Sequence, residues 1–207
     1  MIVERSMKGV FSDGPYGFGW IAEEPRLLQR ASHALVSDGQ VWLVDPVQVE
    51  GLEERVRAAG RVVGVLQLLD RHGRDCAALA RAYGVPLRFV PRAGTPGPPF
   101  ELLGAVRIPL WREAALWWPE RRTLVVADAL GTAPYFVAPG ERLAVHPVLR
   151  VFPPRALDRL EPEHVLCGHG DGVHGPEAAE TLHEALRTAR RRTPAWLGGL
   201  VRARIGR

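Results

Sequence analysis

Acidic and imidazole side chains follow three short apolar runs of this chain, at the position where each run ends. The five side chains are Asp70, His72 and Asp75 after residues 62–69, Asp128 after residues 123–127, and His169 after residues 164–168. Short apolar runs bounded by glycine and polar residues are typical of buried strands. Carboxylates and imidazoles bind zinc and related metal ions. Three strand ends that each carry such side chains therefore predict one shared metal site.

Each of these five residues also has an ordinary structural role open to it that needs no metal. Asp128 could cap a turn, and His169 could hydrogen-bond within its glycine-rich loop. Asp70 could keep a loop solvated, and Asp75 stands where the N-cap of a helix at 76–83 would lie. The residue types alone leave both interpretations open.

The segments around the first candidates alternate between predicted strands and helices. Residues 32–45 have the pattern of a hairpin, because an Asp-Gly pair at 38–39 supplies two positive-φ positions between apolar runs. Amphipathic stretches that end in glycine predict helices at 51–60 and 76–83. A short apolar segment at 85–90 predicts a further strand.

The second half of the chain starts with several predicted strands that no crossover helix separates. They lie between residues 101 and 127, after a loop at 91–99 that is rich in proline and glycine. Strands joined in this way pair antiparallel. The longest predicted helix spans 177–191 and ends at Pro194. We therefore predict an α/β fold of two face-to-face sheets with helices outside, in preference to one doubly wound sheet.

Length and composition limit the class of protein. A chain of 207 residues can bury a substantial core, and we expect one domain over 1–207. No apolar stretch is long enough for a membrane-spanning helix, and the first residues lack the layout of a secretory signal. Cys76 and Cys167 lie far apart, which favours reduced thiols and a cytoplasmic location over a disulfide framework.

Positive charge is concentrated at the C-terminal end. Residues 187–207 carry seven arginines and no acidic residue, so the rest of the chain has a net charge of about −3. Such a tail could contact nucleic acid or anionic lipid, but a solvated helix end with a frayed terminus explains it more simply. No recognised nucleic-acid-binding module accompanies the tail. We therefore expect neither a nucleic-acid nor a membrane partner.

The ordered set of motifs resembles the metallo-β-lactamase fold superfamily, whose members are metal-dependent hydrolases with an αββα four-layer sandwich. In that family a His-x-His-x-Asp-His motif follows one strand, another histidine follows a later strand, an aspartate closes the next, and a Gly-His pair comes last. Here residues 69–76 (Leu-Asp-Arg-His-Gly-Arg-Asp-Cys) stand at the first motif, Asp128 at the aspartate and His169 at the last histidine. The resemblance extends over residues 32–187 and implies a divergent member.

The first motif departs from the family pattern at most of its ligands. Asp70 replaces the first histidine and remains a possible oxygen ligand, whereas His72 is retained. Without a gap, the motif's aspartate and last histidine fall on Arg74 and Asp75. With one inserted residue they fall on Asp75 and Cys76, and the sequence leaves this choice open.

The middle histidine of the family is absent. Pro109 stands at its position, and Glu113, which we expect at the surface, is the nearest replacement. Arg74 places a cation where the family has a carboxylate, so it could bind an anionic substrate or pair with Asp128 in place of a metal. A standard two-metal centre is therefore not expected.

The resemblance implies a hydrolase with a reduced metal centre that acts on a small-molecule ester, thioester, lactone or phosphoester. We expect one ion rather than two, zinc or else iron or manganese. Asp75 is expected as a general base or as a ligand. The alternative is an inactive protein of the same fold, with no metal, that serves as a binding or scaffold module. The expected metal ligands are Asp70, His72, Asp75, Asp128 and His169.

Overall fold

The N-terminal part of the chain forms a six-stranded sheet. The computed structural model describes residues 7–23, 28–93, 97 and 99–205. Neighbours among the first four strands are antiparallel, whereas β4, β5 and β6 run parallel because helices connect them. The strands pair in sequence order: β1 (Gly9–Gly14), β2 (Gly17–Ala22), β3 (Ala31–Ser37), β4 (Gln40–Val44), β5 (Arg61–Gln67) and β6 (Leu87–Phe89).

The predicted hairpin at 32–45 is confirmed as β3 and β4. Asp38 and Gly39 form its turn with φ angles of 50° and 69°, the positive values that an Asp-Gly pair tolerates. The helix predicted at 51–60 is α1 (Leu52–Ala59), and the helix predicted at 76–83 is α2 (Cys76–Tyr83). Local turn chemistry and glycine stops were thus sufficient to locate these elements.

The second half of the chain forms a five-stranded sheet. Its strands β7, β8 and β9 are consecutive and antiparallel, as predicted, and β12 then pairs parallel with β9. A separate two-stranded ladder joins β10 (Leu130–Gly131) to β11 (Ala144–Val145). In spatial order the sheet consists of β13 (Val173–His174), β12 (His164–Leu166), β9 (Thr123–Val125), β8 (Trp111–Trp118) and β7 (Glu101–Ile108).

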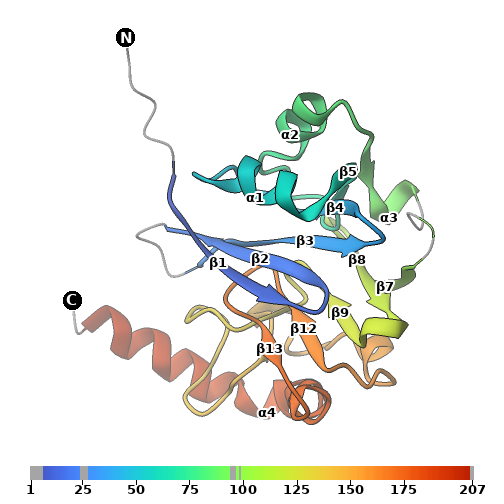
Figure 1. The fold of residues 1–207 in the computed structure, drawn as a ribbon. Helices are drawn as coiled ribbons and strands as arrows, with labels where there is room; N and C mark the ends of the chain where they lie inside the picture. The colour runs from blue at the N-terminus through green and yellow to red at the C-terminus, as the bar shows by residue number, and fades with distance from the viewer. Residues whose placement is uncertain (1–6, 24–27, 94–96, 98, 206–207) are drawn as a thin grey trace.

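The two sheets face each other and helices cover their outer faces (Figure 1). Alternating residues of each strand point to opposite sides, so Leu35 and Leu66 enter the core between the sheets with Leu116. Their neighbours Leu43 and Val65 instead pack under α1 and α2. Helix α4 (Ala178–Ile205) covers the second sheet from the other side. The architecture is the predicted αββα four-layer sandwich.

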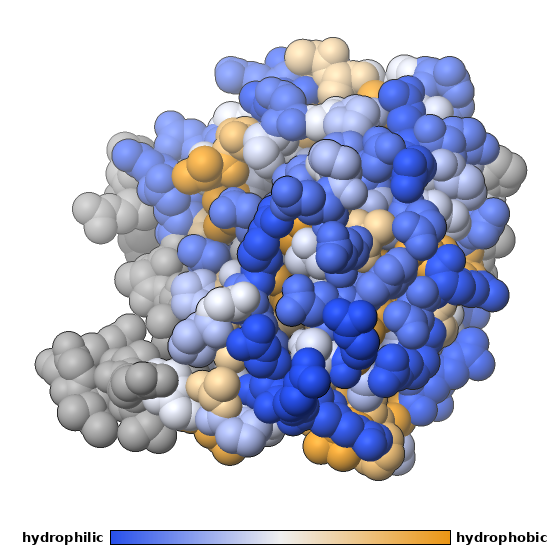
Figure 2. Space-filling view, turned by 90° about the horizontal axis from the view of Figure 1, so that it is seen from below, coloured by the Kyte–Doolittle hydropathy of each residue, from blue (hydrophilic) through white to orange (hydrophobic). Residues whose placement is uncertain are grey.

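Helix α4 is longer than predicted. It runs through Pro194, where we expected it to end, and reaches Ile205. Beyond the proline, the indole Nε1 of Trp196 donates a hydrogen bond to the Tyr135 carbonyl oxygen at 2.8 Å. This tertiary contact supports the helix after the proline, which removes one backbone donor. Seen from below, the face that carries α4 is largely hydrophilic (Figure 2).

Among the helices in the described part of the chain, none combines the length and the apolar character that crossing a membrane requires. The described loops between the sheets' strands include the short helix α3 (Val90–Ala93) and three 3₁₀ turns, at Pro119–Arg121, Pro147–Leu149 and Arg155–Leu157.

Candidate metal centre

Three strand ends bring His72, Asp128 and His169 together. His72 lies in the loop between β5 and α2, Asp128 follows β9, and His169 follows β12. Because β9 and β12 are parallel neighbours, their carboxyl ends reach the same edge of the second sheet. The loop after β5 approaches from the first sheet. The two halves of the sandwich therefore share the site, as the sequence suggested for these three residues.

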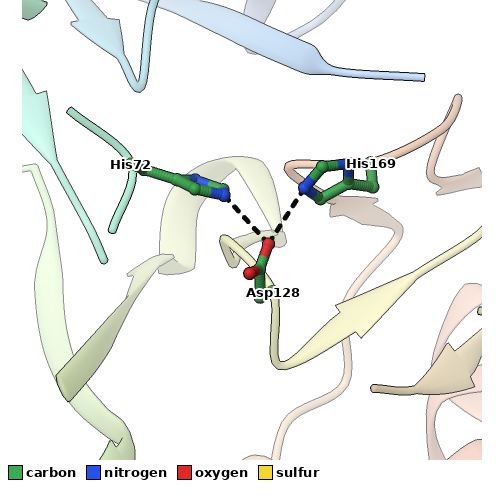
Figure 3. A group of neighbouring side chains, drawn as sticks. All are labelled: His72, Asp128 and His169. Carbon is green, nitrogen blue, oxygen red and sulfur yellow. Dashed lines mark ion pairs between the residues drawn. The ribbon is translucent and has the colours of Figure 1, made fainter. Parts of the chain in front are cut away.

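A single carboxylate oxygen of Asp128 faces both histidines (Figure 3). Asp128 Oδ1 lies 2.9 Å from Nε2 of His72 and 3.1 Å from Nε2 of His169. One ligand atom from each residue lies within 4.8 Å of the others. Since zinc–ligand bonds are about 2.0–2.2 Å long, ligand atoms of one ion lie about 3–3.5 Å apart. The spacing therefore suits one metal ion.

The opposite nitrogen of each ring faces an oxygen atom. His72 Nδ1 lies 3.0 Å from Asp45 Oδ2, and His169 Nδ1 lies 2.7 Å from the Leu28 carbonyl oxygen. These oxygens accept hydrogen bonds, so we assign the proton of each neutral ring to Nδ1. The Nε2 lone pairs then face Asp128 Oδ1 with no hydrogen atom between them. Converging lone pairs of this kind suit a cation. A hydrogen bond donated by the opposite ring nitrogen to an oxygen atom is typical of histidines that bind metals.

Asp128 Oδ1 is buried and has no well-aligned hydrogen-bond donor among the described residues. Burial alone would raise the pKa of Asp128, but the hydrogen bonds and positive charge that His169 and His72 supply in their protonated forms outweigh it and hold the pKa far below its ordinary value. Asp128 is therefore negatively charged at neutral pH. An orphaned anionic oxygen between two imidazole nitrogens fits a bound metal ion.

Protonation of His72 would compete with metal binding. Burial and the Arg74 charge lower the pKa of His72, but its contacts with Asp128 and Asp45 outweigh both and raise the pKa overall. A protonated His72 would bridge the two carboxylates, whereas a neutral His72 offers its lone pair to a metal. The network thus has one protonated form and one metal-binding form.

Arg74 stabilises the loops of the site by donating hydrogen bonds to backbone carbonyl oxygens. Its guanidinium donates to the carbonyl oxygens of Asp45 and Gly168, each at 2.9 Å, and to that of Ala31. Its Nη2 lies 3.5 Å from His72 Nε2. The structure shows no ion pair between Arg74 and Asp128 among the described residues, although the sequence allowed one. Arg74 therefore does not replace a metal ion by pairing with that carboxylate.

Gly168 permits the close approach of the two halves. A Cβ atom at this position would lie 2.7 Å from the Ala127 carbonyl oxygen and 2.9 Å from His72 Cε1. Only glycine fits between these atoms without displacing one of them. The Gly-His pair of the sequence thus has a packing reason as well as a chemical one.

Asp45 is a functional candidate that the analysis of the sequence missed. It follows β4 with a φ of 42° and is almost fully buried. Its Oδ1 accepts a hydrogen bond from the Leu68 backbone at 2.9 Å, while Oδ2 holds His72. The available signal was an acidic residue directly after an apolar run, the same signal that selected Asp128.

The structure does not bring Asp70 and Asp75 into the ligand group. Asp70 is exposed, and its Oδ2 accepts a hydrogen bond from the Arg112 backbone at 3.0 Å. Asp75 occupies the N-cap position of α2 without capping it, because its Oδ2 accepts from the Gln48 backbone at 2.8 Å instead. Among the described residues, the group that could hold a metal consists of His72, Asp128 and His169.

Glu113 is buried, contrary to the expectation that it faces solvent. Its Oε1 accepts hydrogen bonds from the backbone N–H groups of Ala127 and Ala129, both at 2.9 Å, and Trp111 donates to Oε2. Burial, helped by the charge of Asp128, raises the pKa of Glu113 to about 7. Glu113 therefore holds the backbone on both sides of Asp128 and is not a replacement ligand.

Comparison with solved structures identifies the architecture. The DIM-1 metallo-β-lactamase matches with a TM-score of 0.55 and 12% identity over 88% of this chain and 98% of that one. The mono-zinc form of the metallo-β-lactamase FIM-1 from Pseudomonas aeruginosa matches with a TM-score of 0.54 and 10% identity, over 90% and 98% of the two chains. No family model and no curated protein sequence matches the chain. The protein has the metallo-β-lactamase fold, with a possible His-Asp-His metal site and low sequence identity to these two structures.

Proposed function

We propose that His72, Asp128 and His169 bind one metal ion and that the protein is a metal-dependent hydrolase. The observation that carries this proposal is the convergence of two Nδ1-anchored imidazoles on the orphaned Oδ1 of Asp128. Two imidazoles and one carboxylate suit zinc, and they also accept iron or manganese. The mono-zinc form of FIM-1 gives a one-ion centre a precedent on this fold.

The residues of the chain fix the site before a metal arrives. Asp45 and the Leu28 carbonyl orient the two rings, and Glu113 and Arg74 hold the backbone on which the ligands stand. A metal ion bound by such ligands acts as a Lewis acid and lowers the pKa of water towards neutrality. The substrates that this chemistry serves are small esters, thioesters, lactones and phosphoesters. We leave Asp70 and Asp75 out of the proposed centre because their carboxylates are hydrogen-bonded elsewhere.

We infer that the protein works in the cytoplasm on a small molecule. Both cysteines are free and buried, which suits a reducing compartment. The arginine-rich segment continues helix α4, and Arg187, Arg190 and Arg191 are exposed on it. Solvated arginines at a helix end are explained without a nucleic-acid partner.

The second candidate function is a binding or scaffold module without turnover. The contacts of His72 favour it, because this ring has a carboxylate beside each nitrogen and a guanidinium 3.5 Å away. Such a network could persist as a protonated cluster without any metal. The hydrolase predicts turnover of a substrate, whereas the binding module predicts none.

A hydrolysis screen distinguishes the two functions. The protein is loaded separately with zinc, iron(II) or manganese and tested on nitrophenyl esters, acyl thioesters, acyl lactones and nitrophenyl phosphates. We expect multiple turnover on at least one class, and a fall to the level of the metal-free protein in the variant Asp128→Asn. Equal rates in both proteins would contradict the hydrolase. A stoichiometric metal without turnover on any class would favour the binding module.

A further inference from the structure

A cavity of about 550 Å³ opens on the β7–β8 hairpin, and one of its lining residues, Glu113, hydrogen-bonds to the backbone on both sides of Asp128. Its volume lies within the range of small-molecule sites. Apolar side chains form most of its wall, among them Leu102, Val106 and Ile108. Its polar side chains include Arg107 and Arg112, so the cavity combines an apolar lining with positive charge.

The two arginines form an unusual cross-strand pair. Arg107 on β7 and Arg112 on β8 lie directly opposite each other in the antiparallel register, so their side chains start from the same face of the sheet. Like charges at opposite positions destabilise a sheet. Neither guanidinium has an ion-pair or hydrogen-bond partner among the described residues. Within the described structure no carboxylate forms an ion pair with either guanidinium, although the Asp70 carboxylate accepts a hydrogen bond from the Arg112 backbone.

Glu113 does not neutralise this pair. It is the acidic residue among those that line the cavity. Both of its carboxylate oxygens are engaged by the Trp111 indole and by the backbone of Ala127 and Ala129. The positive charge at the cavity thus remains available to an anion from solution.

Leu110 adds an apolar side chain to the rim of the cavity. It is 91% exposed and lies in the hairpin turn with a φ of 62°. A leucine in the left-handed region is strained, and asparagine or glycine would adopt this conformation more easily. The Leu110 side chain is almost fully in water, so it adds little to the core. The apolar part of a bound ligand would cover this side chain.

Two residues of the cavity wall, Arg112 and Glu113, hydrogen-bond to segments of the candidate metal centre. Arg112 exchanges two hydrogen bonds with Asp70, which is two residues from His72 in the chain. The neighbouring Glu113 holds the backbone on either side of Asp128. A molecule in the cavity would therefore lie on β8, whose Arg112 and Glu113 hydrogen-bond to the segments that carry two of the three proposed ligands.

We propose that this cavity binds an amphipathic anion, a carboxylate or phosphate joined to an apolar group, with the anion held between Arg107 and Arg112. As the substrate subsite of the metal centre, this assignment rests on the proposed function; as a binding site, it does not need the metal. Guanidinium groups hold carboxylates and phosphates through charge-assisted hydrogen bonds. The apolar chain would contact Leu102, Ile108 and Leu110.

Calorimetric titration of the metal-free protein tests the binding site by itself. The probes are octanoate and octyl phosphate, with octanol as the uncharged control and inorganic phosphate as the control without an apolar part. We expect octanoate or octyl phosphate to bind at least about tenfold more tightly than either control, a difference of about 1.4 kcal/mol. The two anionic probes show whether carboxylate or phosphate is preferred. Equal binding of octanol would contradict the proposal.

Three variants locate the binding. Arg107→Gln with Arg112→Gln should weaken the anionic probes at least about tenfold, since two charge-assisted hydrogen bonds are lost. The matched control, Arg61→Gln with Arg81→Gln, removes two exposed arginines that do not line the cavity and should change affinity less than twofold. Leu110→Asn should also weaken the probes. Equal losses in the control pair and the cavity pair would overturn the assignment.

Thermal unfolding of the same variants separates binding from misfolding. Removing the opposed charges or the strained leucine should leave the unfolding midpoint unchanged or raise it. A lowered midpoint in both the arginine pair and Leu110→Asn would show that these residues serve the fold, and it would contradict the proposal. Metal content and hydrolysis are measured independently, so a failure of the proposed function remains distinguishable.

Discussion

The Nδ1 atom of each proposed imidazole ligand hydrogen-bonds to an oxygen atom. For His72 that oxygen belongs to Asp45. The carboxylate of Asp45 fixes both the ring orientation and the position of the ring proton. Its second oxygen is anchored by the Leu68 backbone, so the carboxylate itself cannot rotate freely. Asp45 is therefore a positioning residue whose effect reaches the metal through His72.

The variant Asp45→Asn should reverse the tautomer of His72. The Leu68 N–H keeps the amide oxygen in place, so the amide NH₂ faces Nδ1 and the ring proton moves to Nε2. We expect the zinc affinity to fall about 10–100-fold, as measured by competition with a chelating dye. The matched control Asp70→Asn removes an equal charge and should change affinity less than threefold. A larger loss in Asp70→Asn than in Asp45→Asn would contradict this account.

Glu113 should make stability depend on pH in the metal-free protein. Its pKa rises from an ordinary 4.5 to about 7 on folding, so the folded protein prefers the protonated carboxyl. This stabilising contribution is fully present below pH 4.5 and is lost as the pH rises through 7. The variant Glu113→Gln lacks the titration. Urea unfolding should show the wild type losing about 3 kcal/mol relative to the variant across this window. A constant difference between the two proteins would refute the assignment.

At the scale of the elements, strand ends and tight turns were predictable from the sequence. The Asp-Gly turn at 38–39, α2 and the strand before His169 follow from local patterns, whereas the parallel pairing of that strand with β9 does not. The continuation of α4 beyond Pro194 was not predictable, because it depends on a contact between Trp196 and a distant carbonyl. For the same reason, the burial of Glu113 is visible only once β8 lies beside the turn that carries Asp128.

The connection between β10 and α4 is fixed by a buried ion pair. Arg150 is fully buried and donates to both carboxylate oxygens of Glu141, at 3.0 and 2.6 Å, and to the Phe136 carbonyl. Phe136 in turn stacks on the His169 ring with a centroid distance of 5.4 Å. This pair therefore supports the loop that covers one side of the candidate centre.

Arg150→Met should be strongly destabilising because it leaves the buried Glu141 carboxylate without its cationic partner, with the Ala138 backbone N–H as its remaining donor. We expect a loss of about 3–5 kcal/mol in the free energy of unfolding in urea. The double variant Arg150→Met with Glu141→Leu should recover part of this loss, since no unpaired charge remains. A single variant that costs less than about 1 kcal/mol would show that the pair is not needed.

At the scale of the whole molecule, the proposed ligands tie the two halves of the sandwich together. His72 comes from the first sheet, while Asp128 and His169 come from the second (Figures 1 and 3). The alternation of strands and helices in the first half, and the run of strands without crossover helices after residue 100, were enough to predict the two facing sheets. Which strand-end acids meet in space was not predictable, since Asp45, Asp70, Asp75 and Asp128 give the same local signal.

Metal binding should therefore stabilise the folded molecule as a whole. Zinc at a hundred times its dissociation constant should raise the free energy of unfolding by about 2.7 kcal/mol, because the unfolded chain does not bring the three ligands together. Calorimetric scans with and without zinc measure this shift. The variant Asp128→Asn should show no such gain, and a similar gain in both proteins would place the binding elsewhere.

Metal content after equilibrium dialysis tests the central claim most directly. Zinc is added in slight excess, free metal is removed, and the ions per chain are counted by elemental analysis. We predict one ion in the wild type and in the variants Asp70→Asn and Asp75→Asn, and almost none in Asp128→Asn and His169→Ala. A wild type that retains no ion, or an Asp128→Asn variant that retains as much as the wild type, would contradict a metal centre at these three residues.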